Sequence, residues 1–168
     1  MIDALPTRHG DRLDPEELRA LAARVAARPE LWKPHYDPAA TERTFAALHR
    51  DEIVDVWAIF WLPEHDTGWH DHDVSSGAVH VVEGALEEHV LRLAQPERRT
   101  RHSAGSSFMF VPSHIHRVTC AAPRAISIHA YSPPLWRLGQ YTLTDDGALT
   151  RLSVSYADEL RPLKAAAA

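Results

Sequence analysis

The hydrophobic positions of the chain change from a helical to a strand-like pattern about a third of the way along. The DPEE stretch at 14–17 supplies a capping residue, a proline suited to the first helical position and an acidic first turn. Leu18, Leu21 and Val25 follow at helical spacing. This pattern predicts a first helix that ends at about Ala27.

A second start signal of the same kind, the DP pair at 37–38, precedes the apolar residues Phe45 and Leu48. Proline after a capping aspartate is typical of a helix N-terminus. We therefore expect a second helix that ends near His49 or Arg50.

From about residue 53 onward, short runs of β-branched and aromatic residues alternate with turn residues. The runs are IVDVWAIFW, GAVHVVEG, ALEEHVLRL, SFMFVP, RAISIHAY and RLGQYTL. Their even spacing predicts a closed or sandwiched antiparallel sheet over about 53–155. We expect one all-β domain over 1–168, with helices over about 14–50 and a disordered final LKAAAA.

Composition narrows the class of function. A length of 168 residues with 45% apolar content suits one hydrophobic core. The net charge of −5, without basic runs, argues against nucleic-acid and membrane partners and favours a small-molecule ligand. No signal-like start or apolar stretch of membrane-spanning length is present, so we expect a soluble cytoplasmic protein. Because Cys120 is the single cysteine, a thiolate-rich metal site is excluded.

Histidine is frequent, with 12 residues, and forms two closely spaced pairs. His70 and His72 of WHDH lie two apart, so a strand would direct both imidazoles to one face. His114 and His116 of PSHIH form a second pair that can supply a third ligand from a neighbouring strand. Three imidazoles suit a borderline divalent ion such as iron or zinc. The alternative is a surface HxH in an acidic loop, and two pairs at strand ends favour the metal site.

The first pair lies in a frame that resembles the first motif of the cupin superfamily, G(x)5HxH(x)3-4E(x)6G. Counted from His70, the motif ends correctly at Gly84, but Gly77 stands at the glutamate ligand and Glu64 at the leading glycine. Loss of the carboxylate ligand resembles the thiol dioxygenase branch, notably cysteine dioxygenase, in which three histidines bind iron. The resemblance therefore implies a cupin β-barrel, jelly-roll-like in form.

Two downstream segments extend the resemblance to about residues 43–135. The HRV stretch at 116–118 is similar to the segment that carries the third histidine of that family. The SIHAYSPP stretch is similar to its serine-histidine-tyrosine strand, and here Ser127, His129 and Tyr131 alternate so that all three share a face. The resemblance implies that these three are the catalytic residues.

By resemblance, one Fe²⁺ per chain is held by His70, His72 and His116, with His114 as the alternative third ligand. A small thiol and dioxygen would react at the iron to give a sulfinic acid. Some family members link a cysteine to the active-site tyrosine, and that cysteine position is Gly77 here, so Tyr131 is expected to stay an uncrosslinked phenol.

Candidate substrate-binding positions are Arg50, Trp69 and Gly77. Arg50 precedes the IVDVWAIFW run, where the family carries an arginine that binds the substrate carboxylate, although Asp51 and Glu52 offer a plain ion-pair alternative. L-cysteine is the default substrate, and 3-mercaptopropionate or a larger thiol-imidazole are alternatives. A non-oxidative metallo-cupin, such as a zinc or nickel lyase or isomerase, and a ligand-binding cupin sensor are the competing functions.

Overall fold

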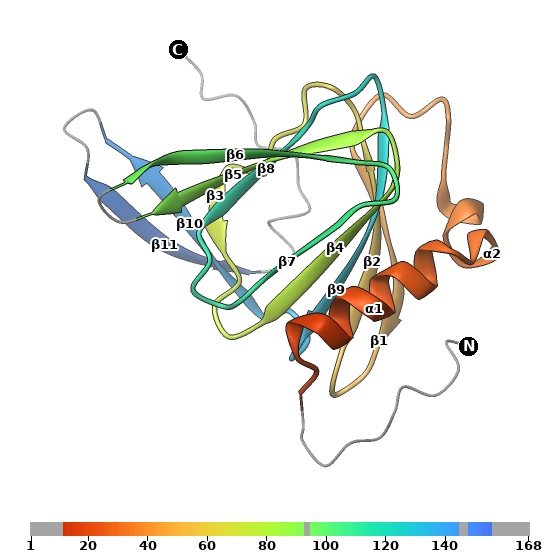
Figure 1. Cartoon of the computed structure of the whole chain (residues 1–168), viewed down its shortest axis with the longest axis horizontal. Coiled ribbons are helices and arrows are strands. Elements are labelled where there is room, and N and C mark those ends of the chain that lie inside the picture. The colour runs from red at the N-terminus through yellow and green to blue at the C-terminus, as the bar shows by residue number, and fades with distance from the viewer. Residues whose placement is uncertain (1–11, 93–94, 145–147, 156–168) are drawn as a thin grey trace.

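Two antiparallel sheets face each other and enclose the interior of the molecule (Figure 1). This computed structural model describes residues 12–92, 95–144 and 148–155. The five-stranded sheet has the order β1 (Thr44–Arg50), β2 (Asp55–Trp61), β9 (Ala125–Ser132), β4 (Ser76–Glu83) and β7 (Ser107–Phe110). The six-stranded sheet has the order β11 (Leu149–Ser155), β10 (Arg137–Leu143), β3 (Trp69–Asp71), β8 (His116–Cys120), β5 (Ala85–Arg92) and β6 (Gln95–Ser103). The all-β prediction is confirmed.

Helix α1 (Pro15–Ala26) forms where the sequence predicts it. The Asp14 carboxylate accepts a hydrogen bond from the backbone N–H of Glu17 (2.9 Å), and the Glu17 carboxylate accepts one from the N–H of Asp14 (3.0 Å). Leu18, Leu21 and Val25 are buried. The helix lies across the outer face of the five-stranded sheet and covers it (Figure 1).

Strands β2 and β9 separate two hydrophobic clusters, because successive residues of a strand point to opposite faces. The outer face, which packs against α1, carries Val56, Ala58 and Phe60 from β2 and Ile126, Ile128 and Ala130 from β9. The inner face carries Trp57, Ile59 and Trp61 from β2 and Ser127, His129 and Tyr131 from β9. Burial on both faces explains why IVDVWAIFW is continuously apolar rather than alternating.

The prediction of a second helix that ends near His49 or Arg50 is wrong, and so is the prediction that the strands of the barrel begin at about residue 53. Asp37 caps a turn, in which its carboxylate accepts from the N–H of Ala39 (2.8 Å), and the chain then enters β1 at residue 44. In β1 the residues alternate between exposed and half-buried, and Phe45 is 43% exposed. The second helix, α2 (Pro29–Trp32), lies earlier and continues into the 3-10 helix η1 (Lys33–His35).

The disorder predicted for the last residues concerns a part of the chain, 156–168, that lies outside the described residues. Within the described ranges, neither helix has the length and apolar content needed to cross a membrane. The cytoplasmic location stays a prediction from the sequence.

Candidate metal centre

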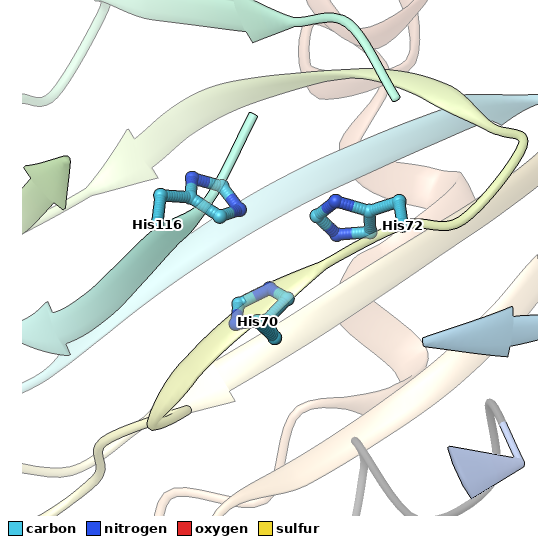
Figure 2. Close-up of side chains that lie close together, drawn as sticks. All are labelled: His70, His72 and His116. Carbon is cyan, nitrogen blue, oxygen red and sulfur yellow. The ribbon is translucent and has the colours of Figure 1, made fainter. Parts of the chain in front are cut away.

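His70, His72 and His116 converge between the two sheets (Figure 2). His70 on β3 is the direct antiparallel partner of His116 on β8, and His72 follows β3. The ring centroids lie 4.7 Å apart for His70 and His116, 4.8 Å for His70 and His72, and 5.2 Å for His72 and His116. One nitrogen from each ring lies within 4.8 Å of the other two. All three residues are buried, so the cluster is a preformed nitrogen donor set.

Hydrogen bonds fix the tautomers of two of these rings. Nδ1 of His70 donates to the carbonyl oxygen of Gly68 (3.0 Å), and Nδ1 of His116 donates to the carboxylate of Glu88 (3.0 Å). Because both acceptors lack a hydrogen to give, each ring carries its lone pair on Nε2. Gly68 has a φ of 68°, a left-handed conformation that glycine adopts without steric cost.

The lone pair of His116 meets the requirement of a metal ligand. Its Nε2 is buried, and no group in the described part of the chain hydrogen-bonds to it. A buried polar atom without a partner is unfavourable, and coordination to a metal would remove that cost. Burial lowers the pKa of His116 to about 3 and the pKa of His72 well below its usual value. Both rings are therefore neutral at physiological pH, as metal ligation requires.

The alternative third ligand, His114, lies apart from this set. Its Nε2 is 3.0 Å from the Glu88 carboxylate, and its ring stacks on Phe110 with a centroid distance of 6.0 Å. A second group of potential ligands combines His114 with Glu88 and His116. The nitrogen atoms that lie close to those of His70 and His72 are thus contributed by His116 rather than by His114.

A pocket between the two sheets contains the histidine cluster. The five-stranded sheet contributes Ile59, Trp61, Val79, Phe110, His129 and Tyr131, and the opposite wall contributes Thr67, His70, His72, His116 and Val118. Arg43, directly before β1, completes the lining. The walls are mainly apolar and aromatic, with a few polar groups, as is usual for a small-molecule site.

The predicted serine-histidine-tyrosine series forms one hydrogen-bonded chain along β9. Ser127 Oγ lies 2.8 Å from His129 Nε2, and His129 Nδ1 lies 3.0 Å from the Tyr131 hydroxyl. At its far end, Nε1 of Trp61 donates to Ser127 Oγ (2.8 Å). Burial lowers the pKa of His129 to about 3, so this ring is neutral and carries one hydrogen.

The indole N–H can only donate, so Ser127 accepts the hydrogen bond from Trp61. The directions of the next two hydrogen bonds depend on the tautomer of His129. With its hydrogen on Nδ1 the ring accepts from Ser127 and donates to Tyr131, and with its hydrogen on Nε2 it donates to Ser127 and accepts from the Tyr131 hydroxyl. In both tautomers one neutral ring links Tyr131 to Ser127 and Trp61.

Several solved structures share this pair of sheets. KdgF from Halomonas sp. superposes with a TM-score of 0.50 at 17% identity, over 61% of this chain and 93% of that chain. A conserved protein with a double-stranded β-helix domain from Klebsiella pneumoniae gives 0.51 at 15% identity, over 71% and 91% of the two chains. A cupin superfamily protein from Desulfitobacterium hafniense gives 0.51 at 10% identity, over 62% and 90%. At such identities the likeness concerns the fold alone, and it confirms the cupin prediction.

A family model for cysteine dioxygenase type I matches residues 7–143. The chain belongs to this cysteine dioxygenase family. The match includes all three clustered histidines and the whole of β9, so the resemblance drawn from WHDH, HRV and SIHAYSPP is confirmed. Membership, together with the buried ligand cluster, indicates an oxygenase that holds a metal ion.

The arginine predicted for substrate binding does not lie at the pocket of this cysteine dioxygenase family member. Arg50 forms an ion pair with the fully buried carboxylate of Asp55 and donates to the carbonyl oxygen of Leu135 (2.9 Å). Among the described pocket residues, the arginine is Arg43, which is 6% exposed and lies 5.5 Å from the ring centroid of Trp61. Arg43 was not predicted from the sequence, because the strand that follows it was expected to be a helix.

The other two candidate substrate positions lie just outside the pocket lining. Trp69 packs its ring edge-on against His89, with centroids 6.4 Å apart, on the far side of β3. Gly77 on β4 pairs with Phe110 of β7 on one side and with Tyr131 of β9 on the other, and both of these residues line the pocket. A Cβ at position 77 would lie only 2.4 Å from the Phe110 ring, so Phe110 occupies the space that a side chain there would need.

We expect Gly77→Ala to destabilise the protein by about 1–3 kcal/mol, because the added methyl overpacks against the Phe110 ring. Phe110→Leu makes room, so the same Gly77→Ala change should cost markedly less in that background. Urea unfolding of the four proteins of this double-mutant cycle measures the coupling. Strictly additive effects would show that Phe110 is not the obstacle.

Asp71 anchors β3 from the side opposite to the histidines. Its carboxylate accepts from Nε (2.9 Å) and Nη2 (3.0 Å) of Arg151 and from the Tyr141 hydroxyl (2.5 Å). Burial opposes ionisation of Asp71, but these hydrogen bonds outweigh it and lower its pKa to about 2. The anchor ties β3 to β10 and β11, and thereby fixes the backbone that carries His70 and His72.

Asp71→Ala should lower the free energy of unfolding by about 1–3 kcal/mol, because the buried N–H of Gly139 and the side chains of Arg151 and Tyr141 lose their acceptor. The wild-type advantage should persist above pH 4 and shrink as the pH falls toward 2, since the pKa is 3.8 unfolded and about 2 folded. Urea unfolding across this pH range measures both effects. Asp73→Asn is the control, because Asp73 meets Arg151 at a longer 3.3 Å, and it should cost less than about 1 kcal/mol.

Proposed function

We propose that this protein is an iron-dependent thiol dioxygenase that converts a small thiol, by default L-cysteine, into its sulfinic acid. The buried cluster of His70, His72 and His116 in a pocket of a cysteine dioxygenase family member carries the proposal. The overall reaction adds both atoms of dioxygen to sulfur (RSH + O₂ → RSO₂H), so sulfur is oxidised and dioxygen is the oxidant.

Three neutral imidazoles would hold one Fe²⁺ per chain and leave its charge uncompensated, which favours anionic ligands such as a thiolate. Bound iron would supply two kinds of chemistry, a lowered pKa for a coordinated thiol and the electrons that activate dioxygen. Ile59, Val79 and Val118 line the same pocket, and these apolar walls keep water from the reacting sulfur.

Tyr131 would provide the acid-base group of the site. The neutral His129 ring is hydrogen-bonded to the Tyr131 hydroxyl and would hold it toward a bound substrate, to which the phenol would donate a hydrogen bond. Ser127 is hydrogen-bonded to His129 and does not line the pocket, so it would act as a positioning residue. Trp61 lines the pocket and holds Ser127 through its indole N–H. Gly77 leaves no thiol beside Tyr131, which keeps the phenol uncrosslinked.

The position of Arg43 supports a thiol that also carries a carboxylate. Arg43 lines the same pocket as the three histidines, and its planar guanidinium would suit bidentate capture of a carboxylate. L-cysteine and 3-mercaptopropionate both meet this requirement. Trp61, Phe110 and Tyr131 line the pocket, and their bulk favours these small thiols over a larger thiol-imidazole.

The test is anaerobic reconstitution of the apoprotein with Fe²⁺, followed by oxygen-uptake and product-mass measurements against L-cysteine, 3-mercaptopropionate and a thiol-imidazole. A mass gain of two oxygen atoms on one thiol is the expected result, with zinc-loaded protein inactive. Turnover of a substrate by the zinc or nickel form without oxygen uptake would instead identify a lyase or isomerase. Binding of a thiol without any turnover would identify a ligand sensor.

A further inference from the structure

Glu88 is a buried carboxylate in the wall behind His116. It lies on β5, on the same face of the strand as the buried Leu86 and Val90, and only 3% of its surface is exposed. Ionised groups are seldom fully buried unless their charge is compensated. The surroundings of Glu88 must therefore stabilise a negative charge beside the metal centre.

Three imidazoles surround this carboxylate, two from the PSHIH stretch that leads into β8 and one from β6. His116 Nδ1 and His114 Nε2 each lie 3.0 Å from Oε1, and His102 Nε2 lies 3.2 Å from Oε2. These three hydrogen bonds compensate the charge of the buried carboxylate. A carboxylate can only accept, so each of these contacts requires an N–H on the imidazole.

The cluster is also held rigidly. The His102 ring stacks on Phe108 with a centroid distance of 4.2 Å, and the His114 ring stacks on Phe110. The backbone of Glu88 is paired to Val118 of β8 and to Thr100 of β6. A carboxylate fixed from both sides presents Oε1 to His116 in one orientation.

We infer that Glu88 is a positioning residue of the metal centre: it holds His116 as the Nδ1–H tautomer and adds a compensating negative charge one hydrogen bond away from the ligand set. The inference rests on the proposed function, since it presupposes that Nε2 of His116 binds the metal. Gly77 removes the carboxylate that the cupin motif carries as a direct ligand. Glu88 would place one negative charge next to His116 and partly compensate the charge of a bound metal, without occupying a coordination position on that metal.

The charge is tested with Glu88→Gln, which keeps the shape and one acceptor but removes the charge. Glu87→Gln is the matched control, because Glu87 precedes it on β5, points to the opposite face and also contacts a histidine, His89, at 3.0 Å. Anaerobic titration of the apoproteins with Co²⁺, followed by visible absorption, should show about 10- to 100-fold weaker binding for Glu88→Gln. The Glu87→Gln affinity should equal that of the wild type.

The tautomer is tested without metal by long-range ¹H–¹⁵N NMR of the histidine rings. The wild type and Glu88→Gln should show hydrogen on Nδ1 of His116. Glu88→Met, which has no comparable acceptor, should shift His116 toward the Nε2–H form. Thermal unfolding of each apoprotein separates these effects from loss of the fold, and Glu88→Gln alone carries the affinity test if the methionine variant does not fold.

The outcomes distinguish this inference from the proposed function. If wild-type protein does not bind Co²⁺, the metal centre itself is refuted. If the wild type binds Co²⁺ and Glu88→Gln binds equally well, the metal centre stands and the role of Glu88 is refuted. Binding of two Co²⁺ ions per chain, with the second lost in His114→Ala, would also overturn the inference, because Glu88, His114 and Nδ1 of His116 would then be ligands of a second metal.

Discussion

His116→Ala is expected to abolish stoichiometric metal binding and, with it, oxygen uptake. The residue contributes the Nε2 atom that is buried and has no hydrogen-bond partner among the described groups, and it faces His70 across the β3–β8 pairing. Removal of a supporting residue typically weakens metal affinity about 10- to 100-fold, so removal of a direct ligand should exceed about 100-fold. Metal content after anaerobic loading and dialysis, together with Co²⁺ absorption, measures the loss.

His114→Ala is the matched control, since it removes an imidazole two residues away that contacts the same carboxylate. It should retain one metal ion per chain and measurable oxygen uptake. The reverse pattern, with loss in His114→Ala and retention in His116→Ala, would reassign the third ligand. Because His116 is buried, circular dichroism must show that the alanine variant folds, and His116→Gln serves as a second variant of more similar volume.

The alternation of strand residues made much of this site predictable from the sequence. His70 and His72, and the Ser127, His129 and Tyr131 series, share faces because of a local two-residue period that does not depend on the rest of the fold. The absence of a glutamate at Gly77 was equally visible in the sequence. What the sequence left open was the choice between His114 and His116, which depends on the pairing of β3 with β8.

Arg43, the arginine that lines the pocket, could not be predicted because the secondary structure around it was assigned incorrectly. A helix up to about residue 50 gives no reason for Arg43 to face the barrel interior, whereas β1 places it beside Trp61 and leaves Arg50 at the distant end of the strand. The DP pair at 37–38, which predicted a helix N-terminus, instead caps a turn. The two apolar residues that follow, Phe45 and Leu48, are too few to distinguish a strand from a helix.

The burial of Glu88 could have been predicted from the spacing of residues in its strand. In ALEEHVLRL the residue is in phase with Leu86 and Val90, so its side chain had to enter the apolar interior with them. A charged residue in phase with core residues requires a buried partner. The identity of that partner, a histidine from β8 together with two others, depends on the order of strands β6, β5 and β8.

The second large effect concerns Arg43. Arg43→Gln is expected to lower kcat/KM for a carboxylate-bearing thiol such as L-cysteine by about 10- to 100-fold, mainly through KM, because hydrogen bonds to a charged group contribute about 1.5–3 kcal/mol. Turnover of 2-aminoethanethiol, which lacks the carboxylate, should change far less. Steady-state oxygen uptake with both thiols measures the ratio. An equal loss for both thiols would mean that Arg43 acts by packing against Trp61 rather than by binding the carboxylate.

Arg50→Gln separates the two arginines. It removes the cation that forms an ion pair with the buried Asp55 carboxylate, so we expect lower thermal stability with little change in kcat/KM for L-cysteine. The opposite result, a selective loss of L-cysteine turnover in Arg50→Gln and none in Arg43→Gln, would restore Arg50 as the substrate cation. The pocket lining favours Arg43, because a carboxylate bound at Arg50 would lie outside the cavity that holds His70, His72 and His116.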